Sequence, residues 1–137
     1  SLLFISGCAM SQGMHSNIKR ISVSYDNAGS SDVYDFLIEF GNHSIPGHDG
    51  DDVFVKGGGG NFYNQMALPE SMTVSWREAS GKTHNEIVQL INFVPKGVSR
   101  IIFVVNIKDS NLEVNLEIPK ASKDPNNLES DIIPIRE

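Results

Sequence analysis

The sequence is poor in cysteine, in clusters of basic residues and in long apolar runs. A single cysteine, Cys8, among 137 residues excludes an intrachain disulfide, so the core has to stabilise the fold. The 11 Lys and Arg residues are scattered among 17 Asp and Glu, and the net charge is -6. A nucleic acid or an anionic lipid headgroup is therefore a disfavoured partner, because phosphate binding needs clustered cations. A basic protein surface suits this charge best.

Residues 1–17 read as a processed N-terminal segment. An apolar run over residues 2–5 ends in small residues directly before Cys8, as at the cleavage site of a signal peptide. Because no basic region precedes this run, we expect residues 1–7 to be the remnant of a longer signal peptide. Residues 5–8 resemble the bacterial lipobox, which implies a diacylglycerol on the Cys8 thiol, with the polar residues behind it as a tether.

The residue after the cysteine is Ala9, not Asp, which is similar to the sorting pattern of outer-membrane lipoproteins. We therefore expect a periplasmic protein anchored in the inner leaflet of the outer membrane. The alternative is that residues 2–5 form a first strand and that Cys8 is a small buried side chain. No other run reaches the roughly 18 apolar residues of a spanning helix. The remaining residues, 18–137, have the length and composition of one domain with one core.

Short runs of alternating apolar and polar residues predict strands. Residues 72–76 are joined by a Ser-Gly-Lys turn to residues 86–90, and residues 100–108 are joined by a turn at 109–111 to residues 112–118. Each pair predicts a β-hairpin.

The other runs are less regular. Residues 21–25 predict a half-buried strand. Residues 34–40 predict the next one, and although residues 32–40 also fit the spacing of a helix, their aromatic and β-branched content favours the strand. Residues 100–108 are apolar on both faces, which predicts a central strand covered on both sides. The tail, 121–137, is expected to be irregular and to return to the sheet at 131–135. The whole predicts an all-β fold, an antiparallel β-sandwich of about six to eight short strands with little helix.

Four consecutive glycines, 57–60, follow Lys56. A phosphate-binding loop needs its lysine after the glycines, followed by Ser or Thr and a helix, and a dinucleotide loop needs a βαβ unit. Neither context is present. We interpret the glycines as a bend or bulge after residues 53–55 that presents the next three residues at an edge of the sandwich.

The sequence offers weak candidates for metal binding and catalysis. The acidic loop 48–52 has carboxylates that could bind calcium, but it lacks the spacing of an EF-hand, and a solvated loop is the favoured interpretation. The four histidines include no pair at the i, i+4 spacing of a helical zinc site. The nucleophile elbow Gly-x-Ser-x-Gly is absent. We predict no catalytic residue, no metal and no cofactor.

Four segments in this order are similar to a family of lipoproteins. They are the strand-like residues 34–38, the glycine and aromatic run 57–62, Ala-Leu-Pro at 67–69, and Val-Ser-Trp-Arg at 74–77. This combination resembles a group of small Gram-negative lipoproteins that includes the immunity proteins of type VI secretion phospholipase effectors. Several members have a cysteine pair where this chain has residues 63–66.

The resemblance implies a protein that binds a secreted phospholipase and occludes its active site. The rivals are a ligand-binding or envelope-structural lipoprotein and a lipoprotein enzyme. We expect the acidic loop to steer the partner and the aromatic segment to anchor it, with weaker contacts from the next hairpin. The predicted partner-binding residues are Asp49, Asp51, Asp52, Asn61, Phe62, Tyr63, Arg77 and Glu78. For Phe62 and Tyr63, core packing is the alternative.

Overall fold

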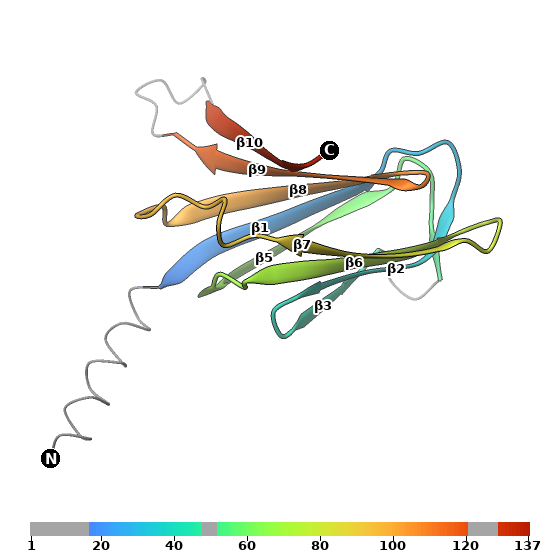
Figure 1. Ribbon diagram of the computed structural model, residues 1–137, viewed down its shortest axis with the longest axis horizontal. Coiled ribbons are helices and arrows are strands. Elements are labelled where there is room, and N and C mark those ends of the chain that lie inside the picture. The colour runs from blue at the N-terminus through green and yellow to red at the C-terminus, as the bar shows by residue number, and fades with distance from the viewer. Residues whose placement is uncertain (1–16, 48–51, 121–128) are drawn as a thin grey trace, which may run out of the picture.

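The computed structural model describes residues 17–47, 52–120 and 129–137, which form two β-sheets packed face to face (Figure 1). The strands are β1 (Ile18–Asn27), β2 (Val33–Phe40), β3 (His43–Pro46), β4 (Val53–Phe54), β5 (Gly59–Ala67), β6 (Ser71–Glu78), β7 (Thr83–Gln89), β8 (Arg100–Lys108), β9 (Asn111–Pro119) and β10 (Ser130–Arg136). The predicted fold class, a β-sandwich, is confirmed, although the described residues contain ten strands instead of six to eight. Nothing in these residues is a helix long and apolar enough to cross a membrane.

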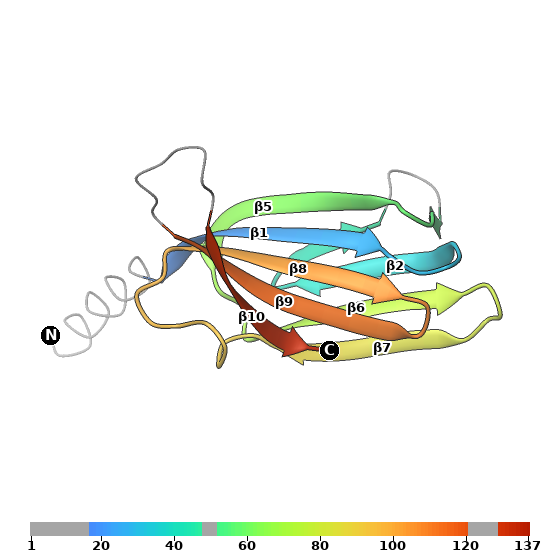
Figure 2. The same cartoon turned by 90° about the horizontal axis from the view of Figure 1, so that it is seen from above.

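The first sheet has the order β10-β9-β8-β1-β5, and the second has the order β3-β2-β6-β7, with β4 beside β2. All neighbours are antiparallel except β1 and β8, which run parallel. Figure 2 shows the first sheet lying over the second. Both predicted hairpins are confirmed, as β6 with β7 and β8 with β9, and the C-terminal return to the sheet is confirmed as β10. Residues 34–40, whose sequence fits both a helix and a strand, belong to the strand β2.

The core lies between the two sheets and follows the alternation of the strands. Burial of the inward-facing apolar side chains is the main stabilising term, at about 1.5 to 3 kcal/mol for each large side chain. The largest fully buried side chains are Phe40, Phe54, Phe103, Ile21, Ile38, Met72, Leu90, Ile101, Ile107 and Leu116. Trp76, the only tryptophan, is also buried in this layer.

The prediction that residues 100–108, now β8, form a central strand covered on both faces is partly wrong. It is central, between β1 and β9, and its inward side chains are fully buried. Its outward Ile102 and Val104 are only half-buried, because within the described chain a second layer covers one face of the first sheet and not the other.

The two ends of the sandwich are formed by different connections. The loop end, at the right in Figure 1, comprises residues 28–32, 55–58, 79–82 and 109–110. The entry end, where β1 begins, comprises residues 17–19, 67–70 and 90–99.

Candidate interaction surface

β5 forms one edge of the first sheet and lacks the features that protect edge strands. It pairs with β1 over nine residues, and no strand of the described chain lies on its other side. Its sequence contains no charge and no proline. The other edges are protected: β10 has Pro134 and a bulge, β3 is four residues long and ends at Pro46, and β7 carries Glu86. A long, uncharged edge is a template for pairing with another chain.

Two hydrogen bonds determine which residues of β5 turn their main chain to the free edge. The amide of Asn27 in β1 donates to the carbonyl of Gly58 (2.9 Å), and the amide of Gln65 donates to the side-chain oxygen of Asn64 (2.9 Å) instead of to β1. In an antiparallel ladder the residues alternate between facing the partner strand and facing away. The main-chain groups of Asn61 and Tyr63 therefore point away from β1, towards solvent.

The side chains of β5 alternate in the same way. Asn61 and Tyr63 lie on the outer face, and Tyr63 is 54% exposed. Phe62 points inward, where its ring lies 6.4 Å from that of Phe40 and 5.2 Å from that of His43. For Phe62 the core-packing alternative is thus the one that the structure supports, whereas Tyr63 is a surface residue.

Asn64 closes the side of the sandwich beneath this edge. Its amide nitrogen lies 3.0 Å from Nε2 of His43 in β3, so it connects the edge strands of the two sheets. His43 thus contacts both Phe62 and Asn64 of β5. Among the residues that the structure describes, no three His, Cys, Asp or Glu side chains come together to hold a metal ion.

The glycine run divides into a bend and the start of β5. Gly57 has φ +79°, in the left-handed region, and makes the turn after β4, so the predicted bend before an edge strand is confirmed. Gly59 and Gly60 instead belong to the strand. A Cβ at Gly59 would overlap the Asp26 carboxylate, and one at Gly60 would overlap the ring of Tyr25.

At the loop end, two of the predicted partner-binding residues lie beside the start of β2. The carbonyl of Asp52 accepts a hydrogen bond from the amide of Asp35 (2.9 Å). Nε of Arg77 lies 3.3 Å from a carboxylate oxygen of the same Asp35, and its guanidinium lies 5.0 Å from the ring centroid of Tyr34. Asp52 and Arg77 therefore both contact Asp35, on the exposed side of the second sheet. The remaining acidic candidates, Asp49 and Asp51, lie outside the described residues, as does Cys8.

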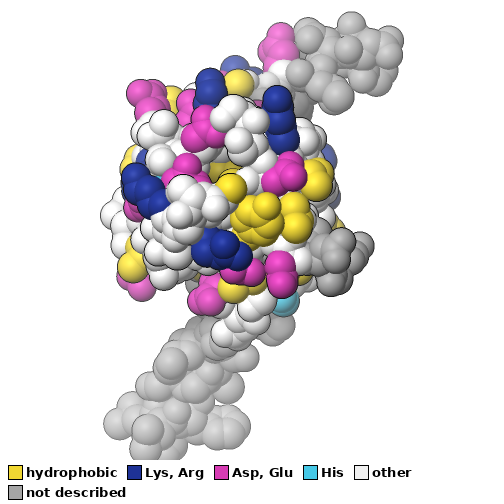
Figure 3. All heavy atoms as spheres, turned by 90° about the vertical axis from the view of Figure 1, so that its right-hand side faces the viewer, with side chains coloured by type: hydrophobic (Ala, Val, Ile, Leu, Met, Phe, Trp, Pro, Cys, Tyr) yellow, Lys and Arg dark blue, Asp and Glu magenta, His cyan; other side chains and the backbone are white. Residues whose placement is uncertain are grey.

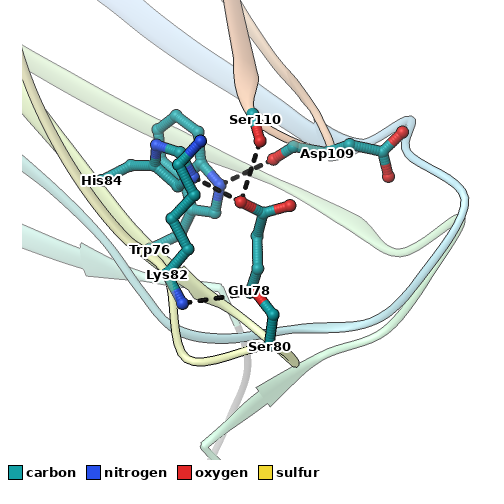
Figure 4. Close-up of polar contacts among 7 residues, drawn as sticks. All are labelled: Trp76, Glu78, Ser80, Lys82, His84, Asp109 and Ser110. Atoms are coloured by element: carbon teal, nitrogen blue, oxygen red, sulfur yellow. Dashed lines mark hydrogen bonds and ion pairs between the residues drawn. The ribbon is translucent and has the colours of Figure 1, made fainter.

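Glu78, the third predicted residue at this end, belongs to a network that links the two sheets (Figure 4). One carboxylate oxygen accepts hydrogen bonds from Nε2 of His84 (2.7 Å) and from the hydroxyl of Ser110 (2.9 Å), and both bonds lower the pKa of Glu78. The indole of Trp76 stacks on the His84 ring and donates to the carbonyl of Asp109 (3.0 Å). The network thus joins the β6–β7 turn to the β8–β9 turn.

The order of these groups differs from that of a nucleophilic triad. In a triad the imidazole lies between the serine and the carboxylate and accepts the hydroxyl proton. Here the Glu78 carboxylate lies between Ser110 and His84. The carboxylate therefore fixes two turns, and the hydroxyl has no imidazole acceptor in this arrangement.

Asn27, which no sequence pattern singled out, holds the other loops of this end together. Its buried amide donates to the carbonyls of Ser31 and Phe54 (3.0 Å each), and its side-chain oxygen accepts from the amide of Gly29 (3.1 Å). Its main chain also bonds the glycine turn, through the amide of Gly57. One side chain thus connects the β1–β2 loop to β4, and its position before an Ala-Gly turn was the only sequence signal.

The remaining carboxylates of the loop end are occupied in a similar way. Asp109 has φ +58°, and its side chain accepts from both the amide (2.9 Å) and the hydroxyl (2.8 Å) of Ser30, which lowers its pKa. Asp32 accepts from the amide of Lys56 (2.8 Å). Asp32, Glu78 and Asp109 line a cleft of about 290 Å³. In each case the carboxylate accepts a hydrogen bond from another residue of the protein, so these residues hold the loops in place.

The surface of this end is mixed in character. Basic and acidic side chains lie interspersed around a group of hydrophobic side chains (Figure 3). Val55, at this end, is 53% exposed. The loops that carry these side chains are hydrogen-bonded to one another, so the end has a fixed shape.

Comparison with family models, with curated proteins and with solved structures gave no match for this chain.

Proposed function

We propose that this protein is a periplasmic, lipid-anchored immunity protein that binds a secreted phospholipase effector and occludes its active site. The observation that carries the proposal is the free edge of β5, which is nine residues long, uncharged and unprotected. Such an edge favours a protein partner, because a strand or loop of another chain can bond to its main chain.

The contact is expected to involve both the main chain and the side chains of β5. Asn61 and Tyr63 offer amides and carbonyls towards the free edge, and their side chains lie together on the outer face. Tyrosine is enriched among residues that dominate binding energy, because it combines a large apolar ring with a polar group. Asp52 and Arg77 lie on the exposed side of the second sheet. A partner that contacts them as well as β5 would reach around this edge of the sandwich, towards the area of about 800 Å² that a stable interface needs from each partner.

Features of the sequence support the compartment and the class of partner. The lipobox-like segment before Cys8 supports a periplasmic anchor, and the resemblance to immunity lipoproteins supports a phospholipase as the target. The net charge of -6 suits steering of a basic effector surface. Occlusion needs a rigid surface, and the fixed loop end beside β5 fits that need.

The proposal is tested by coexpressing the full chain with a phospholipase effector encoded beside it. We expect a stoichiometric complex, and survival of cells in which the effector is exported to the periplasm. Absence of both would refute the immunity function. In addition, Cys8→Ser should release the protein from membrane fractions, and retention of this variant would contradict the lipid anchor.

Two substitutions at one position test the edge of β5 as the contact. Asn61→Ala and Asn61→Pro both remove the side chain, but only proline removes the amide that points to the free edge. We expect Asn61→Pro to weaken effector binding at least tenfold more than Asn61→Ala. Equal effects of the two variants would show that the partner does not pair with this edge.

A further inference from the structure

The entry end contains a groove of about 790 Å³ between the start of β1, the β5–β6 turn and the β7–β8 connection. Apolar side chains form much of its lining, and two lysines are the charged side chains among the described residues that line it. The residues that matter here are Ile18, Leu68, Ile91, Val98, Lys19 and Lys96. Among the residues that the structure describes, no carboxylate belongs to the lining, although the protein as a whole is acidic.

Apolar side chains also extend beyond this groove. Ile18 and Ile91 are each 49% exposed, and Phe93, which does not line the groove, is 37% exposed. Hydrogen bonds fix the segment that carries Ile91 and Phe93: the amide of Ile91 donates to the carbonyl of Glu70, and the amide of Phe93 donates to that of Leu90 (3.0 Å). These side chains are thus held at the surface by a fixed main chain, and a cluster of this kind marks an interaction site.

Four cations lie at this end of the sandwich, two of them in the lining of the groove. Arg20 in β1 is directly paired with Arg100 in β8, so two like charges lie side by side at this end. Like charges that lie directly opposite are unfavourable, and Glu117 in β9, the partner of Ile102, is a carboxylate on the same face. Neither these arginines nor Lys19 and Lys96 take part in an ion pair within the described chain. Nζ of Lys19 donates to the carbonyl of Val98, which orients it along the groove.

We propose that the entry end docks on a bilayer surface that contains anionic lipid. Ile18, Ile91 and Phe93 would enter the headgroup region, and the four cations would contact lipid phosphates. A leaflet fits better than a single lipid molecule held in the groove, because a ligand in the groove would leave Phe93 uncovered. The net charge of the chain disfavours an anionic surface, but the lining of this groove is locally cationic.

If Cys8 carries the lipid anchor of the proposed function, the position of the entry end agrees with docking of this end on the leaflet. The described chain starts at residue 17, next to the groove. Eight residues, 9–16, lie between it and Cys8, so a lipid on Cys8 keeps this end within about 30 Å of the leaflet, even with the tether fully extended. The loop end and the free edge of β5 would then face the periplasm.

The test uses the full chain with Cys8→Ser, so that no anchor contributes and no effector is required. Sedimentation with vesicles of phosphatidylcholine alone, and of phosphatidylcholine with phosphatidylglycerol, measures the partition coefficient. We expect binding to the anionic vesicles that weakens as salt is added. Phe93→Ser should lower the coefficient about tenfold and Lys96→Ala about fivefold, as expected for one interfacial aromatic side chain and one cation.

Matched variants at the opposite end provide the controls. Val55→Ser and Lys82→Ala change residues of the same kinds, 53% exposed in the case of Val55, and should leave vesicle binding unchanged. The Trp76 emission spectrum and thermal midpoint check that each variant is folded. Three results would overturn the proposal: no binding to anionic vesicles, equal losses at the two ends, or one-to-one binding of monomeric lysophosphatidylglycerol without vesicle binding. Because effector protection is measured separately, failure here leaves the immunity function intact.

Discussion

The ring of Tyr25 in β1 lies where the side chain of residue 60 in β5 would stand. These two residues are direct cross-strand partners, and a Cβ built at Gly60 would overlap the Tyr25 ring and hydroxyl. The ring cannot move aside easily, since it is buried, stacks on Phe36 and lies edge-on to Phe54, and its hydroxyl donates to the carbonyl of Pro46 (3.2 Å) in the other sheet. Gly60 is therefore required by packing.

Gly60→Ala is expected to destabilise the protein by about 1 to 3 kcal/mol, the usual cost of forcing a methyl group into a packed site. In a Tyr25→Ala background the same change should cost almost nothing, because the space is then open. The double-mutant cycle, measured by urea unfolding with Trp76 fluorescence, should give a coupling of similar size. Additive effects would show that the methyl group is accommodated without contact with Tyr25.

Asn27→Ala is expected to lower the free energy of unfolding by about 2 to 4 kcal/mol. The substitution leaves the carbonyl of Phe54 buried without its donor and also removes the bond to Ser31. Asn85 in β7 is exposed and is the matched control, at which Ala should change stability by less than about 0.5 kcal/mol. If the two variants unfold at the same urea concentration, Asn27 does not hold the loop end together.

The sequence predicts the long strands well, because each has enough residues for its alternation to be visible. The hairpins β6–β7 and β8–β9 are examples, and so is the return of the chain at β10. β3 and β4 are too short to show a period of two, and β5 begins with glycines that resemble a loop. The prediction for the outer face of β8 was wrong because the residue type does not show what covers it. Ile and Val occur both on a half-buried outer face and beneath a second layer.

The candidate site was predictable in part. The aromatic segment after the glycines does lie on an edge strand, but strand parity, which the sequence leaves open, decides that Phe62 faces the core and Tyr63 faces solvent. The roles of Asn27 and Glu78 depend on partners that are distant in the chain, such as Phe54 and Ser110. Contacts of this kind follow from the order of the strands, which no local pattern reports.

The assignment of these two aromatic residues to opposite faces can be tested directly. Phe62→Ala should destabilise by about 2 to 3 kcal/mol, since the ring packs on Phe40 and His43, whereas Tyr63→Ala should cost less than about 1 kcal/mol. Urea unfolding measures both variants. The reverse order would mean that β5 is shifted by one residue, which exchanges its faces.

The stability of the protein in acid should depend on Glu78. Hydrogen bonds from His84 and Ser110 hold the pKa of Glu78 below its ordinary value of 4.5 in the folded protein. A lowered pKa contributes stability above the ordinary value, and that contribution is lost as the pH falls through the lower, folded value. Glu78→Gln should therefore lower the thermal midpoint at neutral pH and reduce its decline between about pH 5 and pH 3.

Exposed Glu113 on β9 is the control, at which Gln should leave the profile unchanged. The Ser30 bonds to Asp109 lower the pKa of that carboxyl as well, so part of the decline should remain in Glu78→Gln. A profile for Glu78→Gln that runs parallel to that of the unsubstituted protein would show that the carboxylate does not stabilise the link between the two turns.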